Sequence, residues 1–73
     1  MNEEIDISRQ FAKFLKEKRI ALGLTQSEMA KLVFKDESKF QWLSKIEKGR
    51  PVTVITMNTI LNNLNCTINF NEN

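Results

Sequence analysis

Apolar residues recur at helical spacing along most of the chain, and short polar breaks divide them into four groups. In the first group, Phe11, Leu15 and Leu22 share one face of a helix, and the lysines between them fall mainly on the outer side. We expect this helix to begin at Asp6 or Ser8, because either side chain can accept hydrogen bonds from the free N–H groups of a first turn. The pattern therefore predicts an amphipathic helix.

Two further helices are expected after short breaks. Gly23 ends the first helix, and Thr25 and Glu28 then form a capping box, in which each side chain satisfies a backbone N–H at the new helix start. The polar residues 35–38 interrupt the apolar pattern after this second helix. A third helix is expected over residues 39–48.

The C-terminal part of the chain changes its periodicity. Gly49 is expected to end the third helix, and Thr53 can cap a fourth. Cys66, Ile68 and Phe70 then alternate with polar residues, which predicts a short strand. A single strand needs a neighbour for its backbone groups, and the simplest is its copy in a second subunit. The expected core consists of Phe11, Phe14, Leu15, Met29, Leu32, Val33, Leu43, Ile46, Met57, Ile60, Leu61 and Leu64.

Charge is unevenly distributed along the chain. All eleven lysines and arginines lie between Arg9 and Arg50, and with five acidic residues they give residues 8–50 a net charge of +6. Residues 1–7 carry −3 and residues 51–73 carry −1. A basic middle segment suits a polyanionic partner, although an ordinary solvated surface explains the charge equally well.

Composition excludes most catalytic chemistry. The chain has no histidine, so histidine acid–base chemistry and the usual triads are excluded, and its one cysteine, Cys66, can form neither an intrachain disulfide nor a metal cluster. We expect no enzymatic activity, no metal and no cofactor. The N-terminus lacks the apolar region of a signal peptide, and no apolar run reaches the roughly 20 residues that span a bilayer. The protein is expected in the bacterial cytoplasm.

A longer motif, in two parts, restricts the possible functions of the chain. It runs from Arg19 to Ala30, RIALGLTQSEMA, and continues from Leu43 to Gly49, LSKIEKG. This pattern resembles the phage-repressor (Xre/Cro-type) helix-turn-helix family. The resemblance implies one domain over residues 1–73, with an all-α, four- to five-helix repressor-like fold over residues 8–64 that binds double-stranded DNA.

Residues 53–64, which lead directly into the C-terminal segment, are similar to HipB-type antitoxins of toxin–antitoxin systems. In that subfamily the C-terminal β-strand, here residues 66–71, pairs with its twin to complete a homodimer. The resemblance implies a transcriptional repressor that binds a palindromic operator, regulates its own operon and is nucleoid-associated when bound. It also implies a HipA-like serine/threonine kinase toxin as partner, whole or split.

Arg19 falls on the apolar face of the first helix, where a charge needs a partner. Glu47, beside Ile46 on the third helix, is the natural partner, and the resemblance implies a buried Arg–Glu pair at these positions. We therefore expect both residues to be scaffold and not DNA-reading groups.

Matching positions in the family imply two sets of DNA contacts. The phosphate-binding set is Lys18, Thr25, Gln26, Lys48 and Arg50. The base-reading set is Lys39, Phe40, Gln41, Ser44 and Lys45. Gln41 could bond an adenine edge and Lys45 a guanine edge. Gln26 stands at a helix N-terminus, which favours an anion, although a solvated first-turn residue is the alternative interpretation.

The chain departs from the family pattern between the two halves of the motif. Phe34 replaces the usual glycine, and residues 35–38 form an inserted loop. Phe40 and Trp42 stand where polar residues commonly face the DNA groove. Phe40 could contact a thymine methyl, or both aromatics could form a patch for a protein partner. The favoured interpretation is that both fold back over the longer turn.

Two alternatives to the antitoxin remain open. One is a phage-type repressor without a toxin partner, which the short strand argues against. The other is a protein-interaction module that has lost sequence-specific DNA reading, which the inserted loop and the aromatic third helix favour. Salt-dependent, sequence-selective DNA binding would separate the second alternative from both repressors.

Overall fold

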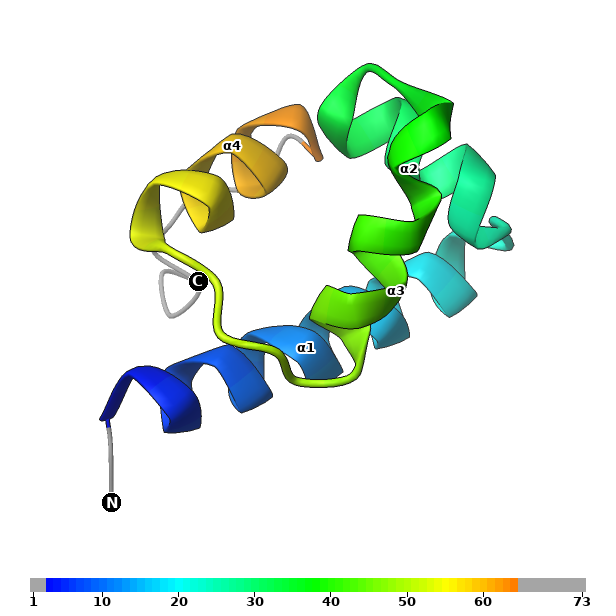
Figure 1. Cartoon of the computed structure of the whole chain (residues 1–73). Coiled ribbons are helices and arrows are strands. Elements are labelled where there is room, and N and C mark those ends of the chain that lie inside the picture. Colours follow the sequence, from blue (N-terminus) through cyan, green and yellow to red (C-terminus); the bar gives the residue numbers. More distant parts are fainter. Residues whose placement is uncertain (1–2, 65–73) are drawn as a thin grey trace.

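The computed structural model describes residues 3–64, with side chains from Asp6 onward, and all regular structure in this part is helical. In Figure 1, α1 lies along one side, α3 crosses it, and α2 and α4 close the remaining sides of one core. The elements are α1 (Glu3–Leu22), α2 (Gln26–Phe34), a 3-10 turn η1 (Glu37–Lys39), α3 (Phe40–Glu47) and α4 (Val54–Asn63). None of these helices is long and apolar enough to cross a bilayer. The predicted strand at 66–71 lies outside the described residues.

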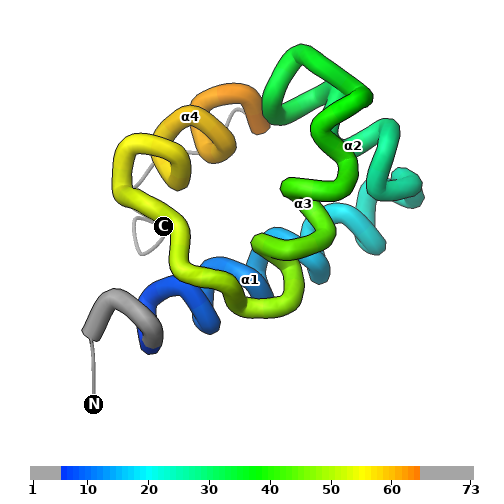
Figure 2. Tube along the Cα trace, viewed as in Figure 1, coloured from blue at the N-terminus to red at the C-terminus, as the bar shows by residue number. Residues whose placement is uncertain are grey.

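Helix α1 begins earlier than the sequence predicted. It starts at Glu3 and not at Asp6 or Ser8, and acidic residue types such as those at positions 3 and 4 are favourable in a first helical turn. Ser8 is instead fully buried inside the helix, and its Oγ accepts a hydrogen bond from the backbone N–H of Val52 at 3.0 Å. The loop between α3 and α4 is thereby tied to α1, and Figure 2 shows this loop passing along the first half of α1.

The end of α1 confirms the predicted stop at Gly23 and corrects the expected placement of Leu22 on the inner face of the helix. Gly23 has a φ of +71°, and the N–H groups of Gly23 and Leu24 donate to the carbonyls of Ile20 and Arg19, which is a Schellman turn. The turn directs the chain toward the core. Leu24 therefore packs against the core, while Leu22 remains 48% exposed. The expectation that Leu22 faces inward is therefore wrong.

Two predicted helix starts are confirmed by their hydrogen bonds. Thr25 Oγ1 accepts from the N–H of Glu28 at 3.1 Å, and the Glu28 carboxylate accepts from the N–H of Thr25 at 2.8 Å, which completes the capping box. Thr53 Oγ1 accepts from the N–H of Thr56 at 3.1 Å at the start of α4. These local bonds fix the first residues of α2 and α4.

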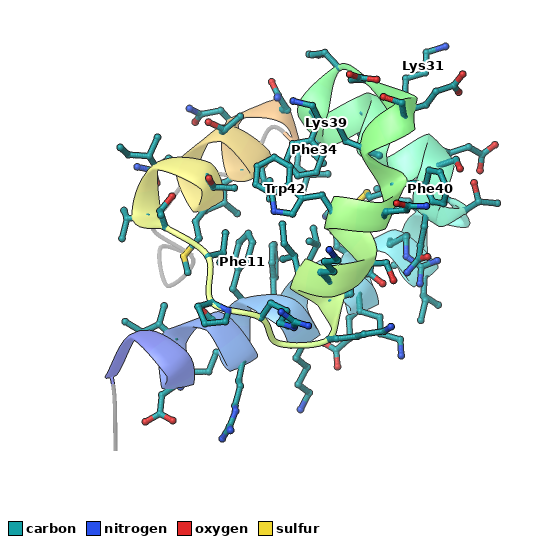
Figure 3. All side chains as sticks on the ribbon, viewed as in Figure 1. Phe11, Lys31, Phe34, Lys39, Phe40 and Trp42 are labelled. Carbon is teal, nitrogen blue, oxygen red and sulfur yellow. The ribbon has the colours of Figure 1, made fainter. Side chains whose placement is uncertain are left out.

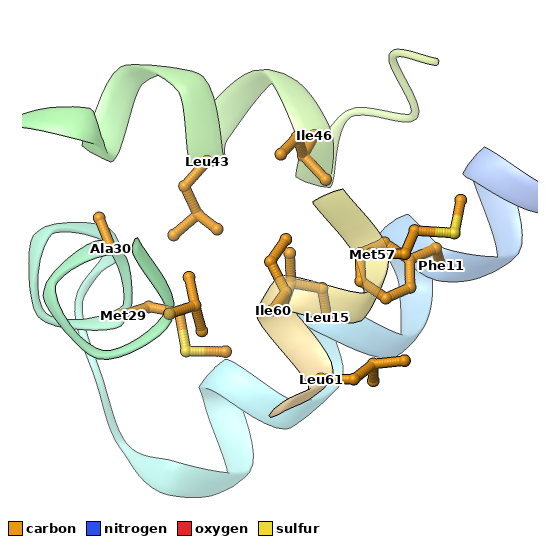
Figure 4. Close-up of a cluster of buried hydrophobic side chains, with 10 residues drawn as sticks. Phe11, Leu15, Met29, Ala30, Leu43, Ile46, Met57, Ile60 and Leu61 are labelled. Atoms are coloured by element: carbon orange, nitrogen blue, oxygen red, sulfur yellow. The ribbon is translucent and has the colours of Figure 1, made fainter. Parts of the chain in front are cut away.

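The core matches most of the prediction. Figure 4 shows its side chains converging from all four α-helices of the described chain. The buried cluster contains Phe11, Leu15, Met29, Ala30, Val33, Leu43, Ile46, Met57, Ile60 and Leu61. Phe14, Leu32 and Leu64, also expected in the core, are partly buried at its edge. Ala30, which is completely buried, was not predicted.

Candidate nucleic-acid interface

Helix α3 presents a polar outer face because its inner face is anchored in the core. Leu43 and Ile46 are buried, which turns Gln41 and Lys45, both exposed, toward the outside. Ser44, on the flank of this face, is partly buried. An exposed helix face that carries an amide and an ammonium has the donors and acceptors needed to bond base edges in a major groove.

An ion pair fixes the C-terminal end of α3. Arg19 Nε lies 2.7 Å from Glu47 Oε2, and Arg19 Nη2 donates to Glu47 Oε1 at 3.1 Å. The Glu47 side chain is 4% exposed and that of Arg19 16% exposed. The hydrogen bond to Glu47 raises the pKa of the Arg19 guanidinium, which favours its charged form. Arg19 also donates to the Leu24 carbonyl at 3.1 Å, which ties the end of α1 to the same pair.

The start of α2 is joined to this pair. Gln26 Nε2 donates to Glu47 Oε1 at 3.2 Å, so the glutamine amide braces α3 from the first turn of α2. Thr25, which is exposed, uses its hydroxyl in the capping box. Both residues lie at the N-terminus of α2, a helix of nine residues. The free backbone N–H groups at such an end favour an anion.

The segment after α3 brings two exposed cations to the end of the α3 outer face. Gly49 has a φ of +94°, and the N–H groups of Gly49 and Arg50 donate to the carbonyls of Ile46 and Lys45. This Schellman turn holds Lys48 and Arg50 next to the end of α3, and both are exposed. Lys18, the remaining member of the predicted phosphate set, is half-buried on α1.

The aromatic residues of α3 point to opposite flanks of the helix. Trp42 stacks on Phe34, with ring centroids 4.6 Å apart and an interplanar angle of 8°, and Lys39 Nζ lies 5.7 Å from the Trp42 ring centroid. Figure 3 shows this group between α3 and the C-terminal end of α4, with Phe40 on the other side of α3. Trp42 therefore stacks back on Phe34 at the longer turn, as expected, although it remains 42% exposed. Phe40 lies on the other flank and is 39% exposed.

The inserted loop is a compact turn. Lys35 adopts a left-handed conformation with a φ of +61°, so the special backbone position falls on Lys35 and not on Phe34. Asp36 Oδ1 then accepts from the N–H of Ser38 at 3.0 Å and from its hydroxyl at 2.6 Å, which caps η1. These bonds hold the pKa of the Asp36 carboxyl below its usual range. The insertion therefore leads directly into α3 through η1.

Two supporting contacts carried no signal in the sequence. Asn63 Nδ2 donates to the Val33 carbonyl at 2.6 Å and so closes the C-terminal end of α2 from α4. Ser8, which the sequence marked as a helix cap, holds Val52 in the loop that follows Arg50. Both bonds join residues at least thirty positions apart, and local patterns do not reveal such pairs.

The fold and the polar outer face of α3 are those of a DNA-binding domain. Hydrogen bonds from Arg19 and Gln26 to Glu47 hold α3 in place, and its polar face is exposed to a duplex. The sequence profile of the helix-turn-helix family matches residues 15–71, which is more than half of the chain, and the chain belongs to this family. Neither a comparison with curated proteins nor one with solved structures gave a match. The chain is therefore a DNA-binding transcription regulator, from a family that is typically non-enzymatic. In the described part of the chain, no group of acidic or cysteine side chains could hold a metal ion.

Proposed function

We propose that the protein is a dimeric transcriptional repressor that binds a palindromic operator and acts as the antitoxin of a HipA-like kinase toxin. The observation that carries the DNA-binding part is the α3 face. Gln41 and Lys45 are exposed on it, while Glu47 on the same helix is held by both Arg19 and Gln26. A reading helix that is fixed before binding loses little entropy on docking, which favours recognition.

The contacts divide into two classes in this proposal. Base edges are read by Gln41, Lys45, Ser44, Lys39 and Phe40, with Gln41 and Lys45 contributing most. Phosphates are held by Lys18, Thr25, Gln26, Lys48 and Arg50. Because Gln26 already donates to Glu47, its contribution comes from the N–H groups of the α2 start more than from its amide. Two copies place two α3 helices in successive major grooves, about 34 Å apart.

The antitoxin part rests on the C-terminal segment. Residues 53–64 and the alternating residues 66–71 are similar to HipB-type antitoxins, and pairing of Cys66, Ile68 and Phe70 segments across a twofold axis would complete the dimer. A phage-type repressor without a toxin partner is the alternative in the same class. Copurification with the product of a neighbouring kinase-like reading frame supports the antitoxin, and absence of any complex rejects it.

A second candidate is an interaction module, which the exposed Phe40 and Trp42 favour. Fluorescence anisotropy of the full chain with its own upstream DNA and a scrambled duplex separates the two candidates. Selective binding that Gln41→Ala weakens, with Lys13→Ala as the exposed control on α1, supports the repressor. Equal and weak binding to both duplexes supports the interaction module.

A further inference from the structure

Arg9 on α1 lies against the turn that follows α3. A Cβ added at Gly49 would lie 3.6 Å from Arg9 Cγ, so the aliphatic stem of Arg9 packs beside the Gly49 backbone. The neighbouring residue Ser8 accepts a hydrogen bond from the N–H of Val52 at 3.0 Å, which holds the loop after the turn on the same part of α1 (Figure 2). These two contacts fix the position of Arg9 relative to the turn.

Residues 48–52, all within the described chain, have no free backbone N–H group with which to bind an anion. Each residue from 48 to 50 donates its N–H to a carbonyl of α3. Val52 donates to Ser8, and Pro51 has no N–H. An anion at this turn must therefore be held by side chains, unlike an anion at the start of α2, where backbone N–H groups contribute.

Arg9 brings a further cation to the two that the turn already carries. It is exposed, as Lys48 and Arg50 are, and it forms no ion pair with an acidic residue of the described chain. Its guanidinium therefore keeps its donors available to a ligand. A guanidinium presents paired N–H donors that match the oxygens of a phosphate, so the chemistry of this cluster suits a phosphate group.

We propose that Arg9 binds a backbone phosphate of the DNA beside those held by Lys48 and Arg50, so that α1 and the turn after α3 form one phosphate-binding surface. This inference rests on the proposed DNA binding and adds a contact near the start of α1. Phosphate contacts fix the register and orientation of a protein on a duplex without encoding sequence. Because Arg9 lies outside α3, its contact orients the whole domain and does not read bases.

The salt dependence of DNA binding by the full chain tests this contact. Arg9→Gln removes the charge but retains the part of the stem that packs beside Gly49. It should reduce the slope of log K against log salt by about 1, so that the loss of affinity is about 3- to 4-fold larger at 50 mM than at 200 mM salt. The upstream DNA and a scrambled duplex should lose equal affinity, since a phosphate contact encodes no sequence.

Two further variants separate a phosphate contact from a change in net charge or in structure. Lys13→Gln removes the same charge from an exposed position one turn further along α1 and should leave the slope unchanged. Arg9→Lys retains the charge and should keep the wild-type slope. The melting temperature of Arg9→Gln should stay within about 2 °C of the wild type, because the substituted side chain is exposed.

Lys48→Ala is the positive control for the proposed DNA binding. If Lys48→Ala reduces the slope and Arg9→Gln does not, the inference about Arg9 is wrong and the proposed DNA binding stands. Equal reductions by Arg9→Gln and Lys13→Gln would also overturn the inference, since net charge alone would then explain both. If the wild-type chain shows no salt-dependent binding to either duplex, the proposed DNA binding fails, and the Arg9 contact fails with it.

Discussion

At the scale of single residues, Glu47 connects three helices. It accepts hydrogen bonds from Arg19 on α1 and from Gln26 on α2 while its own backbone belongs to α3. Removal of its carboxylate leaves the largely buried guanidinium of Arg19 and the amide of Gln26 without this acceptor. The structural consequence is a less constrained reading helix, and the energetic consequence is a less stable fold.

We expect Glu47→Ala to lower the free energy of unfolding by about 2–3 kcal/mol, somewhat less than for a fully buried pair because Arg19 is 16% exposed. Urea unfolding measures the change. The matched control is Glu17→Ala, which removes an exposed carboxylate on α1 and should change stability by less than about 0.5 kcal/mol. Equal effects of the two substitutions would mean that the ion pair contributes nothing.

Asp36 gives a prediction about pH. Its pKa is lowered first by the hydrogen bond from the Ser38 hydroxyl and then by the Ser38 N–H. A depressed folded pKa means that the cap of η1 is stabilising above the ordinary pKa of aspartate and is lost as pH falls through the folded value, below about pH 4. An NMR titration of the Asp36 carboxyl should show its midpoint rising in Ser38→Ala. An unchanged midpoint would contradict the assigned cause.

At the scale of elements, local signals were predictable and distant ones were not. The Thr25 capping box, the Gly23 stop and the Thr53 cap depend on residues within one turn, and the structure confirms all three. Ser8 was assigned to a helix start because its distant partner Val52 has no local signature. For the same reason, the sequence could indicate the outer face of α3 as the DNA-binding face. It could not indicate the hydrogen bond that Asn63 donates to the Val33 carbonyl at the end of α2.

The loop between α2 and η1 carries a prediction of its own. Lys35 holds a φ of +61°, which costs a residue with a Cβ about 1 kcal/mol. Lys35→Gly should therefore leave the unfolding free energy unchanged or raise it by up to about 1 kcal/mol, since relief of this cost offsets the greater entropy of unfolded glycine. Lys31→Gly, at an exposed position inside α2, should lower it by about 1 kcal/mol. Equal losses in the two variants would show that Lys35 is not strained.

At the scale of the whole molecule, the distribution of charge and the fold support the same docking face. The net charge of the chain is only +2, yet residues 8–50 carry +6. The turn after α3 places Lys48 and Arg50 beside the exposed Lys45. Phosphate contacts position a protein on DNA without encoding sequence, whereas base contacts encode sequence. Lys48 and Lys45 should therefore affect binding in different ways, although they are only three residues apart.

This difference can be measured by titrating the upstream DNA and a scrambled duplex over a range of salt concentrations. Lys48→Ala should weaken binding to both duplexes equally and reduce the slope of log K against log salt by about 1, since one phosphate contact is lost. Lys45→Ala should reduce the preference for the upstream DNA by roughly 5- to 100-fold, as expected for a lost base contact. Lys13→Ala, on the exposed side of α1, should change neither quantity. If Lys45→Ala altered only the salt slope, α3 would bind the DNA backbone without reading its sequence.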